Sequence, residues 1–150
     1  MSGKMLRTIL ILVLAFHGVG QLMGVIPGLR LFGAGGTSGP EWLKNWSCRS
    51  WLLNGLVGDT AARIIGIILF LAAFIGFVGA VLGLAGVLVP HAMWRTLAVA
   101  AAVLSLVALA LYWNAFVLFF PHKVGNIGVN IAVLVCLLWA NWPLEADIGF

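Results

Sequence analysis

Four long apolar stretches, each bounded by a proline, constrain this chain more than any other feature. A helix rises 1.5 Å per residue, so about 20 apolar residues are needed to cross about 30 Å of membrane hydrocarbon. The stretches are 6–26, 61–89, 91–120 and 124–142, and the prolines at their boundaries are Pro27, Pro90, Pro121 and Pro143. Proline begins or ends a helix at little cost. The pattern predicts an all-α, four-helix transmembrane bundle forming one membrane domain, 1–150.

The composition excludes a water-soluble enzyme. Hydrophobic residues make up 63% of the chain and charged residues 8%, against about one half and one quarter in soluble domains. The eight basic residues are scattered singly near the ends of the apolar stretches, as flanking charges of membrane spans are. We therefore expect the lipid bilayer, and no nucleic acid, as the surroundings of this chain.

The segment 27–60 is the long loop between the first two spans. Within it, 41–57 has tryptophan and leucine on one helical face and mainly polar residues on the other. This predicts an amphipathic helix lying at the headgroup level of the membrane. The alternative interpretation is a lid over a site between the spans.

The charges flanking the first span give the orientation. Lys4 and Arg7 precede it closely, and we expect a retained span rather than a signal peptide because no small-x-small cleavage site follows. Both termini are predicted to be cytoplasmic, in the plasma membrane of a prokaryote. The count of basic residues opposes this orientation, with three on the inside and five on the outside.

Small residues predict how the helices meet, because close backbone approach replaces the hydrophobic effect inside lipid. The second span carries Gly76, Gly79, Gly83 and Gly86 on one stripe, and alanines follow the third span. A tight hairpin of these two spans is the favoured interpretation, and a dimerisation face is the alternative. Gly20 and Gly24 form a further G-x-x-x-G packing motif in the first span.

A few polar residues lie within the spans, where they are costly and suggest a functional site. They are His17, Gln21, Tyr112, Asn114, Asn126 and Asn130. All lie in the half of the bilayer nearest the long loop. They either hydrogen-bond to one another and hold the helices together, or line a polar cavity that binds a lipid or quinone. In the second case His17 is the one residue able to carry a proton near neutral pH.

Other chemistries lack their residues. The chain has no Cys-x-x-Cys, no buried carboxylate and no pair of histidines at matching depth for a haem. Ser105 lies in the third span without a histidine expected at its level, which argues against a serine nucleophile. The sequence thus predicts no catalytic residue, no metal site and no cofactor, and favours a protein that is not an enzyme.

The stretch His17-Gly18-Val19-Gly20-Gln21-Leu22-Met23-Gly24 resembles the first-helix motif of the DoxX-like family of small four-span membrane proteins. Gln21 stands where a lysine is common in that motif. The resemblance implies an accessory subunit of a membrane redox system and carries over no catalytic residue.

Two hypotheses on function follow. The chain is an accessory or scaffold subunit of a membrane complex that docks a membrane or peripheral protein. Alternatively, it binds or transports a small amphiphile, such as a lipid or quinone, at the cluster of His17, Gln21, Asn114, Asn126 and Asn130.

Overall fold

The computed structural model describes residues 2–31, 46–115 and 122–149, and these residues form helices with no strand. The main helices are α1 (Gly3–Leu29), α3 (Leu53–Ala85), α4 (Trp94–Leu111) and α5 (Val124–Leu134, continued by the π-helix η5, Val135–Trp139). Short 3₁₀ helices are η2 (His91–Met93), η3 (Trp113–Ala115) and η6 (Glu145–Ile148). The predicted all-α class is confirmed for the described residues.

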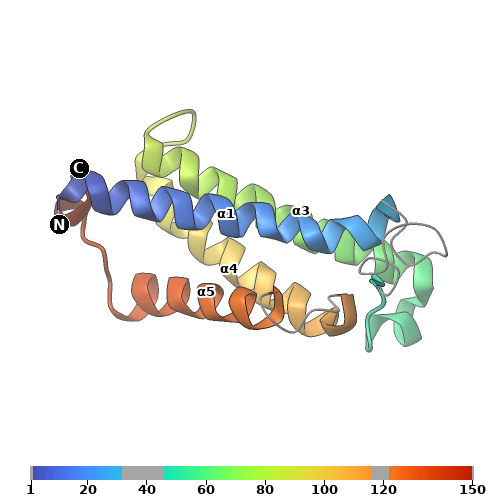
Figure 1. Ribbon diagram of the computed structural model, residues 1–150. Coiled ribbons are helices and arrows are strands. Elements are labelled where there is room, and N and C mark those ends of the chain that lie inside the picture. Colours follow the sequence, from blue (N-terminus) through green and yellow to red (C-terminus); the bar gives the residue numbers. More distant parts are fainter. Residues whose placement is uncertain (1, 32–45, 116–121, 150) are drawn as a thin grey trace.

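The helices run alternately up and down, with α1 packed along α3 and α3 packed along α4 (Figure 1). Both termini lie at one end, where Gly3 contacts the backbone of 147–149. We call this the terminal end, and the opposite end, which holds 30–31, 46–52, 112–115 and 122–123, the loop end. The shared end of the termini agrees with the predicted topology, and the side of a membrane that it faces stays a prediction.

Three helices are long and apolar enough to cross a membrane. They are Gly3–Leu29, Leu53–Ala85 and His91–Leu111, with mean hydropathies of 2.2, 2.8 and 2.0. The fourth apolar helix, Val124–Trp139, is shorter than the predicted span 124–142. It ends early because Asn141 takes a left-handed conformation (φ 46°), which asparagine tolerates better than most residues, ahead of Pro143.

The other predicted boundaries also shift. α1 continues through Pro27 to Leu29 and ends where Arg30 takes a left-handed conformation (φ 55°). α3 begins at Leu53, eight residues before the predicted start, and ends at Ala85 because Gly86 turns left-handed (φ 70°). Within α3 the backbone breaks at Gly58 (φ 80°). The predicted third span extends to 120, but α4 ends at Leu111 and 116–120 lie outside the described residues.

The predicted interfacial helix 41–57 is not formed as one element. Residues 41–45 lie outside the described residues, and 46–52 have no helical structure. The fully buried Trp46 packs against His122 rather than facing a membrane surface. The helical structure starts only at Leu53, where the Ser50 hydroxyl accepts a hydrogen bond from the Leu53 N–H (3.0 Å) in the first turn of α3.

Three of the four glycines predicted to pack the second span against the third do so. A Cβ atom at Gly76 would lie 2.9 Å from Ala101 Cβ, and one at Gly83 would lie 3.0 Å from Trp94 Cβ. Gly79 likewise faces Leu97, so these three glycines form the α3–α4 contact as expected. Gly86 is instead the C-cap of α3.

Of the two glycines in the G-x-x-x-G motif of α1, one packs against a neighbouring helix and the other does not. Gly24 lies directly against the Phe70 ring of α3, and a side chain there would overlap it. Gly20 has open space on its Cα, so it makes no helix contact. The motif therefore supplies one packing residue rather than two.

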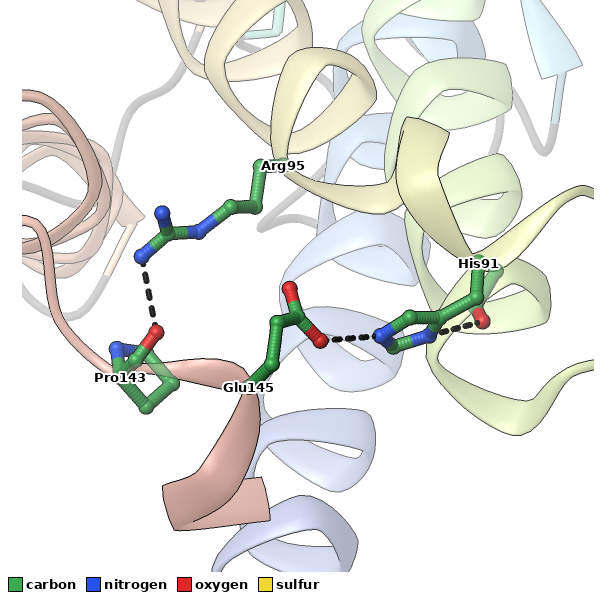
Figure 2. A network of polar contacts seen from close by, with 5 residues as sticks. His91, Arg95, Pro143 and Glu145 are labelled. Carbon is green, nitrogen blue, oxygen red and sulfur yellow. Dashed lines mark hydrogen bonds and ion pairs between the residues drawn. The ribbon is translucent and has the colours of Figure 1, made fainter. Parts of the chain in front are cut away.

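The C-terminal segment is fastened to the α3–α4 turn by polar contacts (Figure 2). His91 Nε2 lies 2.6 Å from Glu145 Oε2, and His91 Nδ1 lies 3.0 Å from the Gly83 carbonyl oxygen. Arg95 donates to Asn141 Oδ1 (2.6 Å) and to the Pro143 carbonyl (2.8 Å). These contacts hold the segment after α5 against the α3–α4 turn, and this segment ends beside the start of α1.

Candidate functional site

A hydrogen-bonded network connects α1, α4 and α5 inside the bundle. Its centre is the buried Ser105 hydroxyl of α4, which lies 2.9 Å from Gln21 Oε1 and 3.0 Å from Asn126 Oδ1. The same hydroxyl accepts from Asn130 Nδ2 (2.9 Å). Since a hydroxyl carries one proton, Ser105 donates to Gln21 or to Asn126 but not to both at once.

His17 closes the network on the side of α1. Its Nε2 lies 3.1 Å from Asn130 Oδ1 and 3.3 Å from Gln21 Nε2. Neutral imidazole Nε2 either donates to the asparagine oxygen or accepts from the glutamine amide, so the tautomer of His17 selects one contact. The edge of the His17 ring also packs on Phe77 of α3, with 4.9 Å between the centroids. The ring is therefore held from three helices.

The structure brings together four of the five predicted site residues. His17, Gln21, Asn126 and Asn130 belong to the network, while Asn114 lies exposed in η3 and makes no contact with it. The prediction for Asn114 assumed a third span that extends to 120, whereas α4 ends at Leu111. Tyr112 is buried and donates to the Ala62 carbonyl, which joins α4 to α3 away from the network.

Ser105 belongs to the network but is not one of the predicted site residues. It does lie at the level of His17, contrary to the expectation that no histidine shares its depth. Depth could have identified it, since Ser105 lies in the half of α4 nearest the loop end, as Gln21 does in α1. Its hydroxyl nevertheless bonds to amide groups and not to the imidazole, so nothing activates it as a nucleophile.

Part of the network is buried between the helices, and part of it borders a cavity. Gln21, Ser105 and Asn130 are fully buried, whereas His17 and Asn126 are only partly buried. His17 and Asn126 line a cavity of about 520 Å³ between α1 and α5. The complete lining consists of Leu12, Val13, Phe16, His17, Gly20, His122, Gly125, Asn126 and Val129. The open space at Gly20 is thus part of this cavity.

A second, smaller cavity of about 170 Å³ adjoins the first on the side of the terminal end. The two share Val13 of α1 and Val129 of α5. Its lining is hydrophobic throughout: Leu10, Val13, Leu14, Trp94, Val129, Ala132, Val133, Cys136, Leu137, Trp142 and Pro143. We call the pair of cavities the α1–α5 groove, which has a polar end at His17 and an apolar end near Trp142.

The polar end contains polar atoms that could form hydrogen bonds to a ligand. Within the part of the chain that the structure describes, His17 Nδ1 and Asn126 Nδ2 make no hydrogen bond. Burial lowers the pKa of His122, which lies just before α5 and lines the same cavity. The polar end therefore offers hydrogen-bond donors and acceptors to a ligand.

The described residues contain no group of three or more histidine, cysteine or acidic side chains that could hold a metal. Comparison of the chain with protein-family models, curated proteins and solved structures found no match in any of the three.

Proposed function

We propose that this chain is an integral membrane protein that binds one neutral amphiphile in the α1–α5 groove. The observation that carries the proposal is the juxtaposition of the two cavities. The cavity that has His17 and Asn126 in its lining adjoins a cavity lined by hydrophobic residues, and the two share Val13 of α1 and Val129 of α5. A molecule with a polar head and an apolar chain matches that order of surfaces.

The exterior of the helices supports a membrane location. Large apolar side chains are exposed along the bundle, among them Phe16 (76%), Ile68 (58%) and Ile75 (60%). Exposed tryptophans occur at both ends, with Trp51 at the loop end and Trp139 at the terminal end. Water disfavours such a surface, while lipid tails and the two interfaces of a bilayer favour it.

The chemistry of the polar end favours a hydroxyl or carbonyl head group. Asn126 Nδ2 can donate to a carbonyl, and His17 Nδ1 donates or accepts according to its tautomer. Because no acidic or basic side chain other than histidine lines this end among the described residues, an ionic head would lose its hydration without gaining a counter-charge from them. A quinone or a fatty alcohol fits these conditions.

Native mass spectrometry of gently solubilised protein tests the proposal. The groove-filling double variant Val13→Phe/Val129→Phe places two rings where the cavities join. A matched control, Val103→Phe/Val107→Phe, adds the same rings to exposed positions of α4 that line neither cavity. We expect wild type and the control to retain one amphiphile and the groove-filling variant to lose it. Equal retention by all three proteins would contradict the proposal.

The second candidate is the accessory or scaffold subunit that the resemblance to the DoxX-like family implies. The observation in its favour is the same groove, because an open side between α1 and α5 would also accept a helix of a partner protein. In-membrane crosslinking of the same variants separates the two functions. Loss of a crosslinked protein from the groove-filling variant, with no amphiphile on the wild type, would favour the subunit.

A further inference from the structure

A third cavity lies at the loop end and shares no lining residue with the groove. It has a volume of about 230 Å³ and is bounded by the end of α1, the segment 46–52 and the first turns of α3. Three arginines line it, one from each of these parts: Arg30, Arg49 and Arg63. Arginines distant in sequence thus share one concave surface, in contrast with the scattered charges that the sequence suggests.

Among the described residues, the lining of this cavity contains one carboxylate, that of Asp59, beside the three arginines. Asp59 Oδ1 lies 3.7 Å from Arg49 Nη2 and accepts from Asn54 Nδ2 (2.5 Å). Within the described residues, Arg30 and Arg63 have no ion pair and no side-chain hydrogen bond. Among the described residues, the cavity therefore holds two positive charges without a carboxylate partner.

The backbone that carries these arginines is fixed by neighbouring contacts. Arg30 is the C-cap of α1 and takes a left-handed conformation (φ 55°), with its N–H bonded to the last turn of the helix. The buried Cys48 thiol lies 3.9 Å from the Arg63 carbonyl oxygen and joins the segment 46–52 to α3. Little backbone ordering is then needed when a ligand binds.

We propose that this cavity binds a phosphate group. Guanidinium groups present paired N–H donors that match phosphate oxygens, and they stay charged at every physiological pH. The hydroxyls of Ser47 and Thr60 line the same cavity and add neutral donors. The loop end lies where α1 finishes and α3 starts, at the level of lipid headgroups if these helices span a bilayer. The phosphate then belongs either to a free anion or to an anionic lipid headgroup.

Two measurements on the full-length protein distinguish these sources. Calorimetric titration of detergent-solubilised protein with inorganic phosphate detects the free anion. Native mass spectrometry after reconstitution with phosphatidylglycerol or phosphatidylcholine detects the headgroup. Saturable phosphate binding assigns the free anion, and selective retention of phosphatidylglycerol without phosphate binding assigns the lipid.

The variant Arg30→Gln/Arg63→Gln removes these two arginine charges and is expected to weaken binding about tenfold or more. The control Lys4→Gln/Arg7→Gln removes the same net charge at the terminal end and is expected to bind as wild type does. Absence of saturable binding in both measurements, or an equal loss in the two variants, would overturn the proposal. Because neither variant touches the α1–α5 groove, the outcome is independent of the proposed function.

Discussion

Removal of the Ser105 hydroxyl should weaken the bundle, since this one group joins three helices. In Ser105→Ala the Gln21 Oε1 atom of α1 loses its hydrogen bond, and Asn130 of α5 loses its contact with α4. Both side chains are fully buried, so water does not replace the lost partner.

The magnitude follows from the two hydrogen bonds that the hydroxyl makes at one time, one as donor and one as acceptor. Interhelical hydrogen bonds in membranes contribute about 0.6 kcal/mol on average and up to about 1.7 kcal/mol. Alanine returns up to about 0.5 kcal/mol through its higher helix propensity. We therefore expect Ser105→Ala to lower the free energy of unfolding by about 1 to 3 kcal/mol.

Equilibrium unfolding in mixed micelles of a mild detergent and dodecyl sulfate measures this change. Thr8→Ala is the matched control, because the Thr8 hydroxyl is exposed and bonds to Lys4 of its own helix. A double-mutant cycle of Ser105→Ala with Gln21→Ala isolates the α1–α4 contact and should give a coupling of about 0.6 kcal/mol or more. A stability loss no larger than that of the control, together with zero coupling, would refute the network as a source of stability.

Three further predictions concern other parts of the molecule. Gly24→Ala should destabilise the protein by about 1 to 3 kcal/mol because the new methyl group overlaps the Phe70 ring, whereas Gly20→Ala, which meets open space, should be neutral or stabilising; equal unfolding midpoints would contradict this difference. Burial raises the pKa of the Cys48 thiol to about 11, so in a Cys136→Ala background maleimide should label native Cys48 slowly at pH 8 and faster as the pH rises towards 11; labelling at pH 8 as fast as in the unfolded chain would be inconsistent with that burial. Glu145→Gln removes the carboxylate that lies 2.6 Å from His91 Nε2, a contact worth about 0.2 to 1 kcal/mol at a partly exposed site; hydrogen exchange at 143–149 should then accelerate while α1 and α3 keep their protection, and unchanged exchange at 143–149 would show that the contact does not hold the C-terminal segment.

The sequence was sufficient for the features that depend on long regular patterns. Apolar runs predicted the all-α class, and glycine spacing predicted the α3–α4 contact at Gly76, Gly79 and Gly83. Helical spacing placed His17 with Gln21 and Asn126 with Asn130, and these four side chains do meet. Each of these patterns reports one helix face, which periodicity determines directly.

The features that sequence reasoning missed depend on single backbone conformations or on neighbours distant in the chain. The left-handed Asn141 shortens α5, and the end of α4 at Leu111 removes Asn114 from the network. Equal spacing gave Gly20 and Gly24 equal roles, yet only Gly24 faces a neighbouring helix. The arginine cavity could not be predicted because Arg30, Arg49 and Arg63 are distant in the sequence and share no helix face.

The central claim is that an amphiphile occupies the α1–α5 groove, and site-resolved photolabelling tests it most directly. The probe is a fatty alcohol with a photoactivatable diazirine midway along its chain, added to the reconstituted protein and mapped by mass spectrometry. The account predicts labels concentrated on groove residues such as Leu10, Val133 and Leu137, and suppressed in Val13→Phe/Val129→Phe. Labels spread evenly over outward residues such as Ile68 and Ile75 of α3, and unchanged in that variant, would contradict it.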